Sequence, residues 1–112
     1  MLSSKLKPAS EPDYLAIVRE MVRQVTADID CTVVLFGSRA RGTARRGSDI
    51  DIGFIGISEA QFVKLRDRIL GELEESVVPH RVDLVNMETV ANSFKKMALR
   101  DVVVWKQGSR VN

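Results

Sequence analysis

The sequence has little cysteine and no long hydrophobic run, and both absences narrow what the protein can be. Its one cysteine, Cys31, cannot form an internal disulfide and fits a reducing compartment. The longest unbroken apolar runs, Val33–Phe36 and Val102–Trp105, are too short to cross a bilayer. The lysines near the N-terminus are not followed by an apolar stretch, so we expect no signal peptide. These features predict a cytoplasmic protein that does not bind membranes.

A strong excess of either charge is also missing. The chain has 17 Lys and Arg against 15 Asp and Glu, which leaves a formal net charge of +2. Nucleic-acid-binding domains usually carry a larger basic excess, so we expect no direct nucleic-acid binding. The charge is nevertheless unevenly placed, because four arginines fall within residues 39–46 and an acidic pair follows at Asp49 and Asp51. This order suggests a polyanionic ligand that arrives with metal ions.

A length of 112 residues suits one domain with a single core. We expect that domain to cover residues 12–107, between a flexible N-terminal tail at 1–11 and a C-terminal tail at 108–112. Apolar residues at helical spacing predict helices from Asp13 to about Asp28, from Ser58 onward with capping-box spacing, and from about Glu88 to Leu99. Segments that are rich in β-branched residues, or in which apolar residues alternate, predict four strands: Cys31–Phe36, Asp49–Ile55, Arg81–Val85 and an edge strand at Val102–Trp105.

The expected order of elements is α-β-β-α-β-α-β, with one helical turn at Ser38–Arg41 in the loop Gly37–Ser48. The fold class is α/β (α+β), with a small mixed sheet and helices over one face. We expect His80 to be a loop histidine without a catalytic role, and Trp105 to cover a sheet edge or lie in an interface.

Three aspartates are the first candidates for chemistry. Residues i and i+2 of a strand share a face, so Asp49 and Asp51 should project to one side while Ile50 and Ile52 face the other way. The Cα atoms of the two aspartates should lie about 6.6 Å apart. Asp83 is a lone acid in an apolar strand and joins them if the two strands are neighbours. Three oxygen ligands without nearby Cys or His favour Mg²⁺ or Mn²⁺ over zinc. The alternatives are a solvated strand face for Asp49 and Asp51, and for Asp83 either an ion pair with Arg81 or a position on an exposed face.

The loop Gly37–Gly42 is the second candidate. Consecutive N–H groups at a glycine-containing turn between a strand and a helix can bind an anion, and the Ser38 hydroxyl adds a donor. The loop has the glycine spacing of a phosphate-binding P-loop but lacks its lysine, and no dinucleotide fingerprint is present. Taken alone, a Gly-Ser turn followed by arginines is more often an ordinary loop.

Together these segments resemble the DNA polymerase beta nucleotidyltransferase superfamily, and within it the minimal nucleotidyltransferases. The resemblance rests on Gly37-Ser38-Arg39-Ala40-Arg41-Gly42, Ser48-Asp49-Ile50-Asp51-Ile52 and Val82-Asp83-Leu84, and it covers roughly residues 13–106. It implies a nucleotidyltransferase fold without the template-handling or tRNA-binding domains of larger relatives.

The resemblance also implies a role for each site residue. Gly37 and Ser38 would hold the β- and γ-phosphates of a nucleotide, and Asp49 and Asp51 would bind two Mg²⁺ ions. Asp83 would complete one metal site and take the proton from the attacking hydroxyl, or orient that hydroxyl. The remaining candidates are Arg39 and Arg41, whose guanidinium groups match phosphate oxygens. The alternative for each is an ion pair with a surface acid.

Relatives of this kind are often antitoxins paired with a HEPN-family toxin. The resemblance therefore implies a Mg²⁺-dependent enzyme that transfers AMP from ATP to a hydroxyl of its partner, although no residue by itself selects adenine. One alternative is an antitoxin that blocks its partner by binding alone, and another is a small-molecule nucleotidyltransferase similar to those that inactivate aminoglycosides. Since a metal site on so small a sheet is open to solvent, we expect a homo-oligomer or a stable complex with a second protein.

Overall fold

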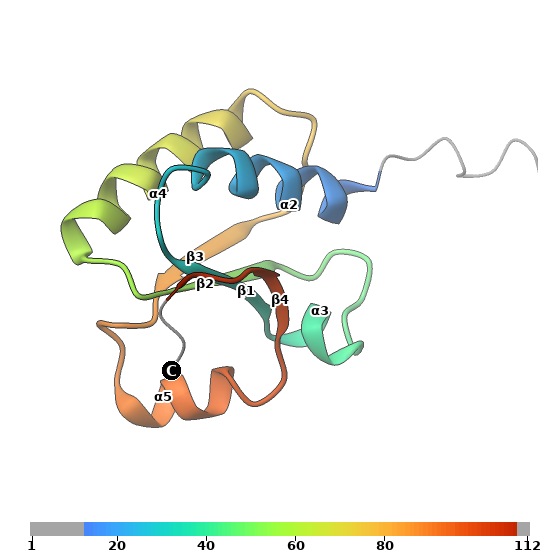
Figure 1. Cartoon of the computed structure of the whole chain (residues 1–112). Helices are drawn as coiled ribbons and strands as arrows, with labels where there is room; N and C mark the ends of the chain where they lie inside the picture. The colour runs from blue at the N-terminus through green and yellow to red at the C-terminus, as the bar shows by residue number, and fades with distance from the viewer. Residues whose placement is uncertain (1–12, 110–112) are drawn as a thin grey trace, which may run out of the picture.

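The computed structural model describes residues 13–109, which form a four-stranded mixed sheet with helices on both faces (Figure 1). The predicted order of elements is confirmed, and the single turn expected after the first strand is a short helix. The elements in chain order are α2 (Tyr14–Val25), β1 (Thr32–Phe36), α3 (Ser38–Arg41), β2 (Ile50–Ile55), α4 (Glu59–Glu74), β3 (Val82–Asn86), α5 (Asn92–Ala98) and β4 (Val103–Lys106).

The strand order in the sheet is β3-β2-β1-β4. β1 pairs antiparallel with β2 and with β4, whereas β2 pairs parallel with β3 through the crossover helix α4. The predicted edge position of the last strand is confirmed. The register places Phe36 opposite Asp51 and Asp51 opposite Asp83. The end of β1 and the beginnings of β2 and β3 therefore meet at one end of the sheet.

The main core lies between the sheet and the helices α2 and α4. Each helix begins at a side-chain cap: the Asp13 carboxylate accepts from the Ala16 N–H at 3.1 Å, and the Ser58 hydroxyl accepts from the Gln61 N–H at 3.2 Å. Inward-facing residues of β2, among them Ile52 and Phe54, have no solvent exposure. Fully burying a side chain of this size stabilises the fold by roughly 1.5–3 kcal/mol. Trp105 belongs to the same core and is only 6% exposed.

The second face of the sheet is covered in part by α5, so the helices are not confined to one face as expected (Figure 1). The physical reason is that alternate residues of the strands, such as Phe36 and Val85, are apolar and point to this second face. Phe36, Met87 and Ala98 form its buried centre. α5 also begins later than its apolar pattern predicts, at Asn92, because a turn follows β3.

The expected tails fall largely outside the described residues. Of the predicted C-terminal tail, Gly108 and Ser109 are described, and their N–H groups donate to Thr32 Oγ1 at 2.9 Å and to Asp30 Oδ1 at 2.8 Å. None of the helices between residues 13 and 109 has the length and apolar character needed to cross a bilayer.

Candidate active site

Two of the three candidate carboxylates lie side by side at the open end of the sheet. Asp51 and Asp83 are register partners on the adjacent parallel strands β2 and β3, whose backbones are about 4.8 Å apart in any sheet. Ile50 and Ile52, which flank Asp51, are completely buried on the opposite face. Asp49 immediately precedes β2 and is exposed. The alternation predicted for this segment therefore directs Asp51 away from the main core.

The carboxylates repel one another in the absence of a cation. Partial burial raises the pKa of Asp51, and the negative charges of Asp83 and Asp49 raise it further, together with a hydrogen bond to Asp83. The positive charge of Arg41 lowers the same pKa but does not outweigh these effects. The end of the sheet is consequently a place where a bound cation gains favourable interactions with more than one carboxylate.

Asp83 also forms the ion pair that the sequence allowed as an alternative. Arg81 Nε lies 3.1 Å from Asp83 Oδ1, but the Arg81 side chain is 74% exposed. Exposed pairs of this kind contribute about 0–1 kcal/mol. Such a weak pair leaves Asp83 able to exchange the guanidinium for another cation.

The donor set fits Mg²⁺ held jointly by protein and substrate. Within the described residues, no three His, Cys, Asp or Glu side chains are grouped closely enough to hold a metal ion by themselves. Mg²⁺ is commonly bound by one or two carboxylates, with water and substrate phosphates completing its octahedral shell. The adjacent oxygens of Asp51 and Asp83, with Asp49 beside them, match that arrangement.

Gly37 packs directly against Asp51, one member of this pair. It follows β1 with a φ of +78°, a conformation that favours glycine. A Cβ on Gly37 would lie 2.3 Å from Asp51 Oδ2, far inside van der Waals contact. Ser38 then opens α3, where the first N–H groups of a helix lack partners within the helix. Gly37 and Ser38 thus lie next to the acidic residues, where an anion bridged to them by a metal ion would be placed.

The two arginines of α3 have different environments. Arg39 donates from Nη2 and Nε to the Ser48 carbonyl at 2.8 and 3.2 Å, and from Nη2 to the Arg46 carbonyl at 3.4 Å. Its donors therefore hold the loop that leads into Asp49. Arg41 is exposed, and its charge is close enough to lower the pKa of Asp51. Of the two predicted phosphate partners, Arg41 is the one whose positive charge acts on Asp51.

His80 contacts the same loop through the Arg46 carbonyl, and the sequence did not predict this contact. Its Nε2 lies 3.2 Å from the Arg46 carbonyl oxygen, and its ring packs 5.5 Å from the ring of Tyr14. A carbonyl can only accept, so Nε2 carries the proton. The contact joins residues 34 apart in the chain, and no local pattern signals it.

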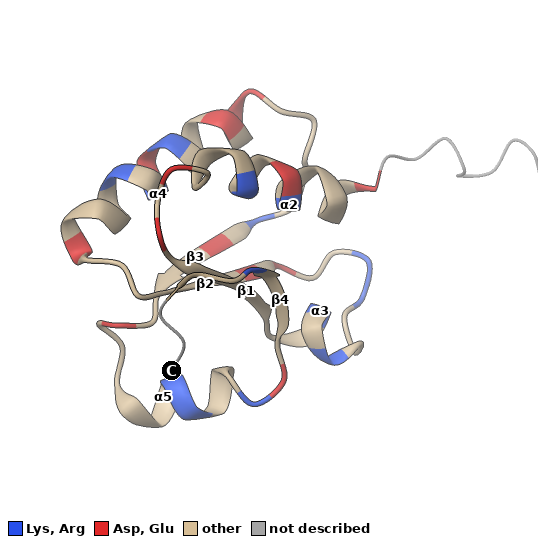
Figure 2. Ribbon diagram, viewed as in Figure 1, with Lys and Arg blue, Asp and Glu red and all other residues tan. Residues whose placement is uncertain are grey.

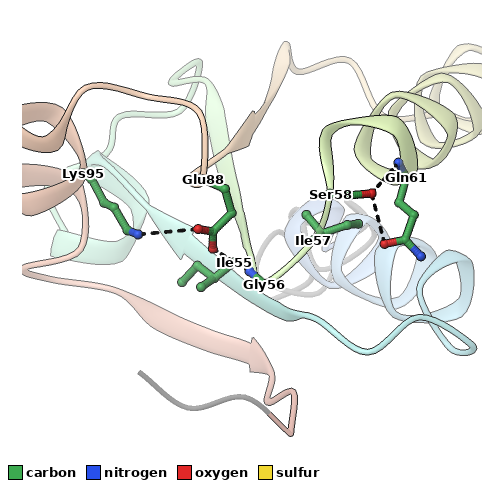
Figure 3. Close-up of a pocket in the computed structure, with 7 residues that line it drawn as sticks. All are labelled: Ile55, Gly56, Ile57, Ser58, Gln61, Glu88 and Lys95. Carbon is green, nitrogen blue, oxygen red and sulfur yellow. Dashed lines mark hydrogen bonds and ion pairs between the residues drawn. The ribbon is translucent and has the colours of Figure 1, made fainter.

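One described cavity lies away from this site. A hollow of about 550 Å³ is found at the other end of β2, lined by residues that include Ser58, Glu88 and Lys95 (Figure 3). Glu88 accepts from the Gly56 N–H at 2.7 Å and lies 3.9 Å from Lys95 Nζ. These contacts tie the turn after β2 to the segment before α5, and we assign this cavity no part in the chemistry at Asp51.

Comparisons with known proteins agree with this geometry. Residues 15–107 match the family described as nucleotidyltransferase domain. A Haemophilus influenzae protein named "Probable protein adenylyltransferase MntA" is 37% identical over 92 residues, which are 82% of this chain and 78% of that protein.

Solved structures show the same fold. One described as a minimal nucleotidyltransferase is 31% identical, with a TM-score of 0.63 over 84% of this chain and 97% of that one. A toxin–antitoxin complex with AMP-PNP contains a chain of the same fold, with a TM-score of 0.58 at 20% identity over 81% of this chain and 74% of that one. From its sequence, its fold and the pairing of Asp51 on β2 with Asp83 on β3, the chain belongs to the nucleotidyltransferase domain family.

Proposed function

We propose that this nucleotidyltransferase transfers AMP from ATP to a hydroxyl of a HEPN-type partner protein and thereby acts as its antitoxin. The observation that carries the catalytic part is the pairing of Asp51 with Asp83, together with the close contact of Gly37 with Asp51. The choice of substrate is supported by the relative from Haemophilus influenzae, which is named as a protein adenylyltransferase. It is also supported by a solved complex of a tri-AMPylated Shewanella oneidensis HEPN toxin with its MNT antitoxin, whose matched chain is 15% identical with a TM-score of 0.55 over 82% of this chain and 71% of that one.

The phosphates of ATP bind at the start of α3. Backbone N–H groups at Gly37 and Ser38 and the Ser38 hydroxyl donate to the β- and γ-phosphates, and Arg41 adds a positive charge at the rim. Asp51 and Asp83, with Asp49 beside them, would hold Mg²⁺ jointly with the substrate phosphates, one ion or two, with Mn²⁺ as a substitute. When bound, the metal neutralises charge on the phosphate oxygens.

Asp83 is positioned to act on the acceptor. It receives the proton of the acceptor hydroxyl, or orients that hydroxyl, as the hydroxyl oxygen attacks the α-phosphorus of ATP. The new bond joins that oxygen to the α-phosphorus, the bond from the α-phosphorus to the bridging oxygen breaks, and pyrophosphate leaves. Arg39 contributes by holding the loop ahead of Asp49 through the Ser48 carbonyl.

The test is intact-mass spectrometry of the protein encoded by the adjacent gene, after incubation with this chain, ATP and Mg²⁺. We expect the partner to gain one or more AMP units, and the Asp49→Asn/Asp51→Asn variant to produce no gain. An unmodified partner that binds both versions equally tightly would identify an antitoxin that acts by binding alone. If the partner neither binds nor gains mass, the proposal is wrong and a small-molecule acceptor becomes the better hypothesis.

A further inference from the structure

Helix α5 is fixed beside the candidate active site. The ring of Phe94 meets that of Phe36 edge-on, with centroids 6.1 Å apart. Phe36 immediately precedes Gly37 and is the register partner of Asp51, and register partners share a face of the sheet. α5 therefore lies on the face that carries Asp51, while α2 and α4 cover the other (Figure 1). A protein that delivers a hydroxyl to Asp51 on this face of the sheet therefore comes close to α5.

The exposed side of α5 has a positively charged groove. We call it the α5 groove; it has a volume of about 530 Å³ and is lined by Asn92, Lys95, Lys96, Leu99 and Arg100. Three of these five residues are cationic and none is acidic. Lys96 and Arg100 are exposed, and Figure 2 shows the basic residues on α5 and in the segment that follows it.

The groove combines this charge with apolar surface. Leu99 contributes an apolar side chain to its lining, and Met97 of the same helix is 61% exposed. Glu88 lies 3.9 Å from Lys95, and the exposed Asp101 directly follows Arg100. The positive charge is thus confined to a short stretch bounded by acids, which suits a few carboxylates better than the long phosphate backbone of a nucleic acid.

We propose that the α5 groove docks an acidic segment of the acceptor protein, with an apolar side chain of that segment against Leu99. This inference rests on the proposed function, since it names the surface by which the acceptor reaches the site. Carboxylates of the acceptor pair with Lys96 and Arg100, and the docked segment is held on the same face as Asp51 and Asp83. Exposed charges of this kind chiefly raise the association rate and the specificity of binding.

The test reverses two charges in the groove and two on the opposite side. The groove variant is Lys96→Glu/Arg100→Glu, and the matched control is Arg19→Glu/Lys64→Glu, which makes the same change of charge on exposed positions of α2 and α4. The affinity of each purified protein for the protein encoded by the adjacent gene is measured over a range of salt concentrations, and ATP binding is measured in parallel.

We expect the groove variant to lose about tenfold or more in partner affinity, with a slower association rate and a weaker salt dependence. The control should stay within about twofold of the original protein, and both variants should bind ATP normally. Equal losses in both variants, or full affinity in the groove variant, would overturn the proposal. So would loss of ATP binding in the groove variant alone, which would assign the groove to the nucleotide.

Three further outcomes separate this inference from the proposed function or decide what the groove binds. A partner that binds through the groove but never gains AMP refutes the transfer and leaves the docking surface in place. If the original protein binds a single-stranded RNA probe, and the groove variant loses RNA but keeps the partner, the groove is a nucleic-acid site and the proposal is wrong. An original protein with no affinity for the partner overturns the docking proposal as well.

Discussion

Gly37 and Asp51 approach so closely that no side chain fits between them. A Cβ on Gly37 would lie 2.3 Å from Asp51 Oδ2, and Gly37 has a φ of +78°. Gly42, at the end of α3, has the same φ of +78° but nothing within 4 Å of the corresponding Cβ position. The two glycines share this φ but differ in ψ, which is −156° at Gly37 and 16° at Gly42, and only Gly37 has the contact with Asp51. Gly42 therefore serves as the control for a positive φ without a neighbouring side chain.

We expect Gly37→Ala to lower the transfer rate by about 100-fold or more, because displacing a reacting group by about 1 Å has an effect of that size. Gly42→Ala should keep nearly full activity and lose about 1–2 kcal/mol of stability, the usual strain of a non-glycine residue in this conformation. Activity assays at a temperature where both variants are folded, combined with urea denaturation, measure the two effects. Equal losses of activity in the two variants would refute the specific role of Gly37.

Asp51 should make the metal-free protein sensitive to pH. Burial, helped by the charges of Asp83 and Asp49, raises its pKa above 3.8 in the folded state. The folded protein then binds this proton more tightly than the unfolded chain, so the stability contributed by the proton is complete below pH 3.8 and is lost as the pH rises through the raised pKa.

Asp51→Asn removes that dependence. In a chelator, the original protein should become less stable relative to Asp51→Asn as the pH rises from 3.8 to neutral, and Mg²⁺ with ATP should stabilise only the original protein. Thermal unfolding at several pH values, with and without the ligands, gives the comparison. A constant difference between the two proteins at every pH would contradict the repulsion inferred at this end of the sheet.

Local patterns in the sequence predicted much of this arrangement, because the properties involved are local. Alternation placed Asp51 and Ile52 on opposite faces, and the structure confirms it. The parallel pairing of β2 with β3, which brings Asp83 to Asp51, is a long-range property that short segments do not encode. For the same reason the contacts of Arg39 with Ser48 and of His80 with Arg46 were not predicted. Trp105 lies in the main core, on the same face as Val103, the register partner of Leu35; the register shift between β1 and β4 at Val33 and Val34 lies beside it, and no short segment encodes that shift.

Lys106 should stabilise the fold through its ammonium group. Its Nζ donates to the carbonyls of Thr26 and Ile29, the latter at 2.6 Å, and so ties β4 to the segment after α2. Lys106→Met retains the aliphatic part but leaves the Thr26 carbonyl without this donor, at an expected cost of about 1–3 kcal/mol. Urea denaturation measures the loss, and Lys64→Met, at an exposed position of α4, is the control. Equal stability of the two variants would show that the contacts contribute nothing.

Arg39 and Arg41 should give different effects in a kinetic assay, because Arg39 donates to the Ser48 carbonyl whereas the charge of Arg41 acts on Asp51. Arg39→Lys cannot keep two donors on the Ser48 carbonyl, so we expect a lower melting temperature and a lower kcat as the loop before Asp49 loosens. Arg41→Lys keeps the charge beside Asp51, and Arg41→Ala removes it.

For Arg41→Ala we therefore expect a several-fold higher KM for ATP at an unchanged melting temperature, with most of the affinity restored in Arg41→Lys. Steady-state kinetics against ATP, run beside thermal unfolding, distinguish the two residues. A KM effect at Arg39 without any change in stability would instead mean that its guanidinium leaves the Ser48 carbonyl and binds the nucleotide when ATP arrives.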